Sequence, residues 1–379
     1  MSYTEVESLI RNFFKEFPLT GHHTNSFDDF IENGIQNIVD EIGVFEKKSL
    51  DEKTCTRYTF QKVFISPPVY ENNISGEYEI ISPKTARLRG LNFSCLLFCD
   101  ILKENINIED PENCQVIESE TFKEIPLGML PMMIGSKYSY AEKENIKGYF
   151  IIGGNDKTLI CQERIAGNTT MTYIKNQGYY CDVRSQSDNG SRITSQISIY
   201  NQEGKQEVNV SIPYINGYID MILLLKALGD DVTSSLDLID DPHWDAYVQN
   251  SQYIDIDQEN ALYLLCEQSN QSFISREHRI KYATDLVNRD VLPHEEQKNK
   301  VLYLYFMILR MYNTKNTGHV DDRDHFSLKR VDTSGALFSS LFRVLFRKLI
   351  LDLSRQLRKV SNFDIRSSLR SSVITKGLS

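Results

Sequence analysis

The stretch from Gly148 to Asn168 reads GYFIIGGNDKTLICQERIAGN, and it gives the clearest indication of how the chain folds. Its first part, Tyr149 to Ile152, is an apolar run typical of a β-strand, and Lys157 to Cys161 can return as a second strand. Between them stand Gly153 to Asp156, and glycine and asparagine tolerate the positive φ angles of a tight turn. The pattern predicts a β-hairpin. Taken alone, it is most simply a surface hairpin with a solvated tip.

The length and composition of the chain are those of an ordinary globular protein. Its 379 residues are enough for two domains, and 41% are hydrophobic and 25% charged. No run reaches the roughly 20 apolar residues of a membrane span. The start, MSYTEVESLIRNFF, lacks the basic and then apolar pattern of a signal peptide. We therefore expect an intracellular protein with no membrane partner.

The charge is unevenly distributed along the chain. The net charge of −10 argues against a general nucleic-acid binder. From Ser339 to Ser379, however, nine Lys or Arg stand against two Asp. An acidic body with a basic C-terminal segment suits a protein that meets nucleic acid on one face only.

The cysteines and histidines show no spacing typical of a metal site. No CxxC pair and no HExxH motif occurs, and a zinc site is not expected. We interpret the His22-His23 pair as loop surface and His294 as structural. Most cysteines lie in apolar runs and are expected to be buried free thiols; they are Cys55, Cys95, Cys99, Cys114, Cys161, Cys181 and Cys266.

The first part of the chain predicts helices followed by strands. Apolar residues recur at helical spacing near residues 4–16 and 26–42. Residues 54–81 alternate like strands, with a turn expected at Ser66 to Val69 because proline cannot donate to a sheet ladder. A buried strand is expected at residues 93–102. The acidic segment 105–124 is interpreted as a loop or an insertion.

The second part predicts strands followed by helices. Strands are expected between residues 169 and 215, and mostly helices between 222 and 312. A long helix is expected from about Gly335 to Val360, with Leu337, Leu341, Leu345, Leu349 and Leu353 as an apolar stripe that Phe338, Phe342 and Phe346 widen. The fold class is therefore α+β.

Several segments together carry a family resemblance. The opening stretch is similar, almost residue for residue, to a segment of the second-largest subunit of multisubunit DNA-directed RNA polymerases, the homologue of the bacterial beta subunit. SPKTARLRGLNF from Ser82 and DDRDHFSLKRVD from Asp321 resemble further family segments, as does Gly190-Ser191-Arg192. One departure is Gly135, where the family has arginine, so a basic side chain is missing there while Lys137 remains.

The resemblance implies an architecture of two mixed domains, of the eukaryotic, archaeal or large-DNA-virus type. Residues 1–168 and 331–379 would form a protrusion domain, and residues 169–330 a lobe inserted into it. Both would wall one side of the cleft that holds DNA and the RNA–DNA hybrid.

The resemblance also implies site residues. The candidates for nucleic-acid contact are Lys157, Gln162, Arg164, Arg370 and Lys376. The acids, histidine and arginines of the segment after Asp321 could suggest catalysis or a metal, but a charge network at the junction of the two domains is favoured. Its members are Arg323, Asp324, His325, Lys329 and Arg330.

Catalytic groups are expected in other chains. We find no carboxylate constellation for phosphoryl transfer, and in the family the magnesium-binding aspartates lie on the largest subunit. This chain would bind no cofactor itself, with Mg²⁺ in the assembled polymerase. Its expected partners are the largest subunit, other polymerase subunits, the DNA template, the RNA–DNA hybrid and general transcription factors.

The resemblance covers nearly the whole chain but only about the N-terminal third of that subunit. A subunit split between two polypeptides, whose partner is the chain carrying the remainder, and a fragment both stay open. The composition hints at an AT-rich genome such as that of a large DNA virus, so the location is nucleus, cytoplasm, viral factory or virion. The alternative is a stand-alone module that binds transcription factors or a polymerase. An independent hydrolase has no motif to support it.

Overall fold

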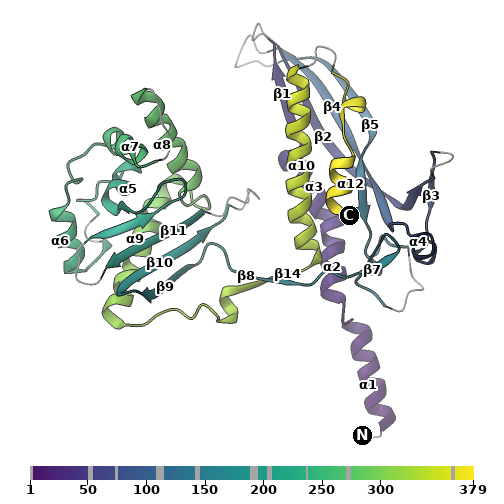
Figure 1. The fold of residues 1–379 in the computed structure, drawn as a ribbon, viewed down its shortest axis with the longest axis horizontal. Helices are drawn as coiled ribbons and strands as arrows, with labels where there is room; N and C mark the ends of the chain where they lie inside the picture. The colour runs from purple at the N-terminus through teal and green to yellow at the C-terminus, as the bar shows by residue number, and fades with distance from the viewer. Residues whose placement is uncertain are drawn as a thin grey trace. The chain divides into compact units, whose positions relative to one another are not determined.

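The computed structural model describes residues 3–49, 54–72, 76–107, 115–140, 146–187, 195–202, 207–235, 238–269, 275–359 and 363–379. The chain divides into two compact units (Figure 1). The first unit combines Met1–Glu163 with Val331–Ser379, and the second is Arg164–Arg330. The second unit is therefore inserted into the first, and the sequence-based boundary at residue 168 lies a few residues past Glu163.

The first unit contains a five-stranded antiparallel sheet. Its strand order is β1-β2-β4-β5, and β3 pairs with β2. The strands are β1 (Val44–Lys48), β2 (Thr54–Glu71), β3 (Tyr78–Ile80), β4 (Ser94–Asn107) and β5 (Gln115–Pro131).

The expected turn at Ser66 to Val69 is wrong, because β2 continues through it. The pairing of β2 with β4 shifts register between Ile65 and Pro68. Such an irregularity lets the ladder accommodate residues that cannot donate a backbone hydrogen bond. The two prolines therefore lie within one long strand and do not end it.

The expected loop at residues 105–124 is also wrong wherever the structure describes this segment. β4 continues to Asn107, which pairs with Gln115 at the start of β5. Acidic residues of β5 such as Glu118 and Glu120 are exposed, and Lys103 faces Glu120 across the ladder at 3.9 Å. A solvent-facing strand tolerates charged residues, so its composition looked like that of a loop.

The first unit also contains helices, of which α3 (Ile35–Ile42) packs against β2. The two expected near the N-terminus are confirmed as α1 (Tyr3–Glu16) and the continuous run α2 (Gly21–Asp29), a π-helical turn (Phe30–Gly34) and α3. The sequence did not predict α4 (Pro83–Arg89), whose first turn is capped by the Ser82 hydroxyl, which accepts a 3.2 Å hydrogen bond from the Thr85 amide.

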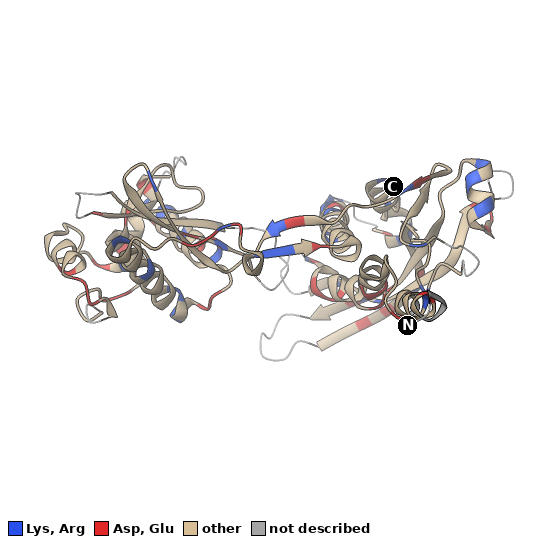
Figure 2. Ribbon diagram, turned by 90° about the horizontal axis from the view of Figure 1, so that it is seen from below, with Lys and Arg blue, Asp and Glu red and all other residues tan. Residues whose placement is uncertain are grey.

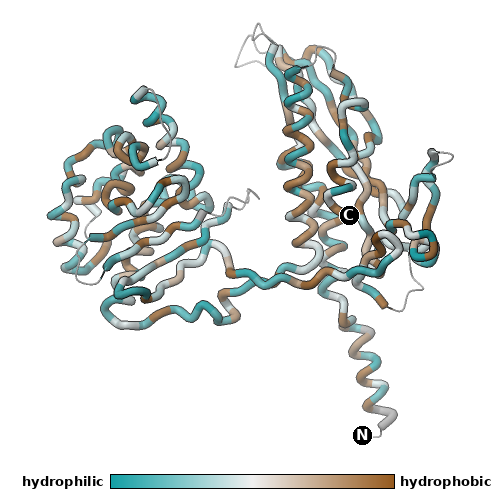
Figure 3. Tube along the Cα trace, in the orientation of Figure 1, coloured by the Kyte–Doolittle hydropathy of each residue, from teal (hydrophilic) through white to brown (hydrophobic). Residues whose placement is uncertain are grey.

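The long C-terminal helix is confirmed as α10 (Ser334–Lys359), which packs against α2, α3 and β1. Its apolar residues recur along the helix (Figure 3), and its buried apolar side chains are Phe338, Phe342, Phe346, Leu349, Ile350, Leu353 and Leu357. The expected leucine stripe is wrong at Leu341, which is 42% exposed. Gly335 lies where α10 crosses α2, and a Cβ there would come within 1.8 Å of the Ser26 carbonyl oxygen.

The second unit is built on another five-stranded antiparallel sheet, ordered β13-β12-β11-β10-β9. Four of its strands lie where the sequence predicts them, within a few residues, and the short β13 was not predicted. The strands are β9 (Thr170–Lys175), β10 (Gly178–Ser185), β11 (Ser195–Gln202), β12 (Val208–Ser211) and β13 (Ile219–Asp220). The Gly190-Ser191-Arg192 element lies outside the described residues.

Helices complete the second unit and confirm the α+β class. α9 (Gln297–Thr317) packs against β9, β10 and β11, and the sole tryptophan, Trp244, is fully buried in the core that they share. The remaining helices are α5 (Met221–Ala227), α6 (Pro242–Asn250), α7 (Gln258–Glu267) and α8 (Arg276–Asp290). None of the helices in the described residues is long and apolar enough to cross a bilayer.

The described cysteines are free thiols, as expected. Burial raises the pKa of Cys95, Cys99 and Cys181 to about 12, so these thiols stay protonated and unreactive at neutral pH. Cys161 is only half-buried, and Cys114 lies outside the described residues.

Candidate nucleic-acid interface

The predicted hairpin is present, with a shorter second strand than expected. β6 (Phe150–Ile152) pairs with β7 (Asn155–Lys157), and Ile152 faces Asn155. The turn is therefore only Gly153-Gly154, with φ angles of 57° and 75°. Positive φ at both central residues is the geometry of the tightest hairpins, and it favours glycine. The second strand begins directly after this turn and ends at Lys157, so Thr158 to Cys161 lie outside it.

The tip of the hairpin lies against the end of α4. The amide of Gly153 donates a 2.7 Å hydrogen bond to the Asn92 side-chain oxygen, and that of Gly154 donates a 3.0 Å bond to the Leu91 carbonyl. A Cβ on Gly154 would come within 2.8 Å of the Gly90 Cα. The tip is thus held in place by backbone contact, while Gly153 stays exposed.

Arg87 holds β7, the second strand of the hairpin, in place. Its Nε donates a 2.9 Å hydrogen bond to Asp156 Oδ1, its Nη2 donates to the Tyr149 hydroxyl, and its guanidinium lies over the Tyr149 ring. Arg89 makes a similar pair of contacts to Tyr70. Both arginines of the SPKTARLRG segment therefore hold the fold together.

A cavity of about 670 Å³ opens beside the hairpin. Charges of both signs are spread over each unit (Figure 2), so a basic site depends on local arrangement and not on the chain total. Here three cations, Arg87, Lys147 and Lys157, line the wall with one carboxylate, Asp156. Its other lining residues are Thr20, His23, Ile146, Gly148, Tyr149 and Thr158.

Lys157 is an available cation of this wall, as is the equally exposed Lys147. Lys157 is exposed, and it forms no ion pair with any residue that the structure describes. Arg87 is already paired with Asp156. A lysine ammonium on a rigid hairpin, left without a carboxylate partner, can neutralise a phosphate without first breaking a protein contact.

Gln162 and Arg164 lie outside this cavity, on β8 (Gln162–Ile165). β8 pairs with β14 (Lys329–Asp332), and both residues are exposed. They follow Lys157 closely in sequence, but the strand that carries them begins only after the unpaired segment Thr158 to Cys161.

Arg370 and Lys376 are held by a different part of the first unit. Arg370 stands between α11 (Ile365–Ser368) and α12 (Ser372–Leu378), and Lys376 is on α12. α12 packs against β5 and α10, and its Thr375 hydroxyl accepts a 3.0 Å hydrogen bond from the Met129 amide. Both cations are exposed, and neither lines the cavity.

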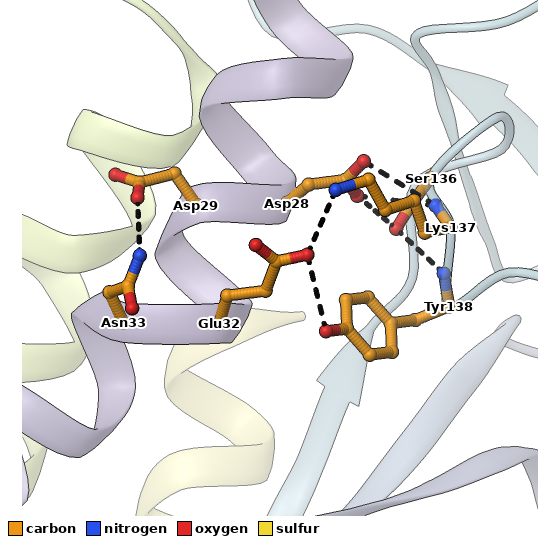
Figure 4. Close-up of polar contacts among 7 residues, drawn as sticks. All are labelled: Asp28, Asp29, Glu32, Asn33, Ser136, Lys137 and Tyr138. Carbon is orange, nitrogen blue, oxygen red and sulfur yellow. Dashed lines mark hydrogen bonds and ion pairs between the residues drawn. The ribbon is translucent and has the colours of Figure 1, made fainter.

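Lys137 is neutralised within the chain (Figure 4). Its Nζ lies 3.0 Å from Glu32 Oε1, which raises the pKa of the lysine. The turn that carries it is fixed by the buried Asp28, whose carboxylate accepts hydrogen bonds from the Ser136 hydroxyl at 2.6 Å and from the Lys137 amide. Lys137 is therefore a weaker candidate for phosphate than Lys157.

The residues predicted for the domain junction form a local turn. Asp324 pairs with Lys329 at 3.3 Å, and His325 Nδ1 caps the 3-10 helix Phe326–Leu328 by accepting from the Ser327 amide. Arg330 donates to the carbonyl of Ser327. Arg323 lies over the Tyr173 ring. These contacts fall within the second unit, and a role at the junction stays a prediction.

Several residues that line the cavity or contact Asp321 were not identified as site residues from the sequence. Lys147 stands in no motif and His23 was interpreted as loop surface, yet both line the cavity with Lys157. Arg310 pairs with Asp321 at 2.8 Å, and Asp321 also accepts from the Thr172 hydroxyl at 2.9 Å. Only the fold brings these residues together, so spacing along the chain carries no signal for them.

Comparison with known proteins identifies the family. Residues 18–376 match the family described as RNA polymerase beta subunit. The chain belongs to this family. It is 29% identical over 415 residues to DNA-directed RNA polymerase II subunit RPB2 of Encephalitozoon cuniculi, covering 98% of this chain and 35% of that protein. It is 31% identical to subunit RPB2 of Meyerozyma guilliermondii, covering 98% and 34%.

The share of each relative that is matched differs between relatives. The chain spans about a third of the length of the RPB2 relatives. It is also 27% identical to DNA-directed RNA polymerase subunit Rpo2N of Methanothermobacter thermautotrophicus, covering 98% of this chain and 78% of that protein. The chain thus corresponds to an N-terminal part of the second-largest subunit.

Proposed function

We propose that this chain works as the N-terminal portion of the second-largest subunit of a DNA-directed RNA polymerase. The observation that carries the proposal is the family match over residues 18–376, together with relatives that are themselves named as subunits of this enzyme. The relatives give no support to the alternative of a stand-alone interaction module. In this proposal the first unit is the protrusion domain and the second is the lobe.

In this proposal the chain holds nucleic acid by electrostatic attraction to its phosphates and does not recognise bases. Lys157 is exposed on a hairpin that backbone contacts hold in place, and it shares its cavity wall with Lys147. Lysines placed in this way neutralise phosphates of any sequence, which is what an enzyme that moves along its template needs. Gln162, Arg164, Arg370 and Lys376 are exposed and would extend this grip to other parts of the nucleic acid.

Bond formation is assigned to other chains of the polymerase. Mg²⁺ prefers an all-oxygen ligand set. Within the described residues, the single group with metal-like geometry is His22, His23 and Cys161, which offers two nitrogens and a sulfur. These residues do not fit Mg²⁺, and in this proposal the chain carries out no catalytic step itself.

The experiment that tests this proposal is purification from the native source. The chain is tagged at its N-terminus, recovered in moderate salt, and its companions are identified by mass spectrometry. We expect the largest subunit and the remainder of the second-largest subunit in stoichiometric amounts. Recovery of a free monomer would contradict the proposal and would favour a detached module.

A further inference from the structure

Three metal-binding side chains meet at the start of α2. His22 and His23 are adjacent in the first turn of this helix, and Cys161 stands in the unpaired segment between β7 and β8. One ligand atom from each residue lies within 4.8 Å of the others. Cys161 is 138 residues from His23 in the sequence, and the fold alone brings the thiol to the imidazole.

The spacing of these atoms is close to that of a zinc site. Zn–N bonds of about 2.0 to 2.1 Å and a Zn–S bond of about 2.3 Å place tetrahedral ligand atoms roughly 3.3 to 3.6 Å apart. The Cys161 Sγ lies 3.5 Å from the His23 Nε2, within this range. The His22 and His23 rings have centroids 4.5 Å apart. A small rotation of the exposed His22 side chain would close the remaining gap.

One ring nitrogen in this group is left without a partner in the part of the chain that the structure describes. His23 Nδ1 is buried without a hydrogen-bond partner among the described residues. Two imidazoles side by side repel each other once protonated, yet each lone pair is attracted to a cation. The neighbouring cavity, which His23 lines, gives a solvent path to the group.

We propose that His22, His23 and Cys161 bind one zinc ion, with a water molecule in the fourth position. Nitrogen and thiolate ligands select Zn²⁺ over Mg²⁺ and Ca²⁺, which take oxygen ligands. The ion ties the N-terminal turn of α2 to the segment that leaves the hairpin. By holding Cys161, the ion would restrain the segment after Lys157, and Lys157 itself lines the cavity. This inference goes beyond the proposed function and does not depend on it.

The test is a metal titration of the full chain after its tag has been removed, because a histidine tag would itself bind zinc. The protein is stripped with a chelator, and Zn²⁺ binding is measured by calorimetry. Co²⁺ is then used as a spectroscopic probe, since a Co²⁺ ion bound by a thiolate shows a sulfur-to-metal charge-transfer band. We expect one ion per chain and this band.

Variants assign the ligands. Cys161→Ser should remove the charge-transfer band, and both Cys161→Ser and His22→Gln should weaken Zn²⁺ binding by at least ~100-fold, because even outer-shell partners contribute 10- to 100-fold. His22 is exposed, so its replacement tests the site even if Cys161→Ser folds poorly. His319→Gln, at another exposed histidine, is the matched control and should bind as the parent does.

Three results would contradict the zinc site. If the parent chain binds no Zn²⁺, or if His22→Gln and Cys161→Ser bind as tightly as the parent, the proposal is wrong. A Co²⁺ complex without the thiolate band would also overturn it. In each of those cases the Cys161–His23 contact is only a weak thiol–imidazole hydrogen bond.

Discussion

The guanidinium of Arg87 and the carboxylate of Asp156 form an ion pair with an N–O distance of 2.9 Å, between residues 69 apart in the chain. The pair joins the last turn of α4 to the second strand of the hairpin that carries Lys157. The same guanidinium also donates to the Tyr149 hydroxyl. Placement of the cation at Lys157 therefore depends on Arg87.

Replacing Arg87 should loosen this hairpin without unfolding the chain. Arg87→Ala removes a partly exposed ion pair and a hydrogen bond, and we expect a loss of about 1 to 2 kcal/mol in the free energy of unfolding of the first unit. Urea unfolding followed by circular dichroism measures this loss. Arg11→Ala, which removes an exposed pair with Glu7, is the control and should change stability by less than about 0.5 kcal/mol.

The single tryptophan allows the unfolding of the second unit to be followed separately in such experiments. Trp244 is buried in the second unit, so its fluorescence reports the unfolding of that unit. Arg87→Ala should leave the fluorescence transition unchanged while the dichroism transition moves. Equal movement of both transitions would contradict a local effect.

The two glycines of the hairpin turn should differ in their tolerance of a side chain. Both have positive φ, but a Cβ on Gly154 would meet the Gly90 Cα at 2.8 Å, whereas nothing lies within 4 Å of one on Gly153. Gly153→Ala should cost only the conformational penalty of about 1 kcal/mol. Gly154→Ala should cost at least about 1 kcal/mol more, measured by the same unfolding assay, because its Cβ also overlaps the backbone of α4. Equal losses would show that the tip does not rest on α4.

The buried face of α10 makes a second stability prediction. Phe342 is fully buried, and Phe342→Ala should destabilise the first unit by about 3 to 5 kcal/mol, because it leaves a cavity in the core. Leu341→Ala, one residue away on the exposed face, should cost less than about 1 kcal/mol. If the two losses were reversed, the leucine stripe expected from the sequence would be the buried one.

Lys300 should make the stability of the second unit depend on pH. Its Nζ donates to the carbonyls of Val287 and Asn288 near the end of α8, and burial lowers its pKa, against an opposing effect of Asp290. Between this lowered pKa and about 10.4, the unfolded chain still binds a proton that the folded chain has lost. Stability therefore rises with pH in that window, by no more than about 1.4 kcal/mol per pH unit.

The comparison of Lys300→Met with the parent measures this effect. Buried tyrosines such as Tyr305 have raised pKa values and act in the opposite direction at higher pH, so the difference between the two proteins is the informative quantity. Tryptophan fluorescence should show a smaller rise in stability for Lys300→Met between pH 8 and about 10. A parallel pH dependence in both proteins would exclude Lys300 as its source.

The sequence predicted those elements that depend on residues close together in the chain. The Gly153-Gly154 turn was found because positive φ is written into its residue types. The helix α10 was found from apolar spacing, and Phe342 and Leu349 are buried as expected, but Leu341 is exposed, because Leu341 and Phe342 are both apolar and only packing decides between them. Pro67-Pro68 and the acidic residues of β5 predicted breaks that long-range pairing with β4 overrides.

The candidate site was only partly accessible from the sequence. Lys157 stands out because the family resemblance marks its segment. Lys147 and His23 carry no motif, and Cys161 approaches His23 across a separation of 138 residues. A pair of adjacent histidines was therefore interpreted as surface, since nothing in the sequence points to the third ligand.

The proposed electrostatic binding of nucleic acid is tested most directly by the lifetime of the elongation complex. This lifetime is measured for the assembled polymerase as a function of salt concentration. With Lys157→Ala and Arg164→Ala combined, we expect a shorter lifetime in moderate salt and a salt dependence reduced by about one unit of log–log slope for each phosphate that is no longer neutralised. Assembly of the subunits should be unchanged. A lifetime and a salt slope equal to those of the parent enzyme would contradict an electrostatic grip by this chain.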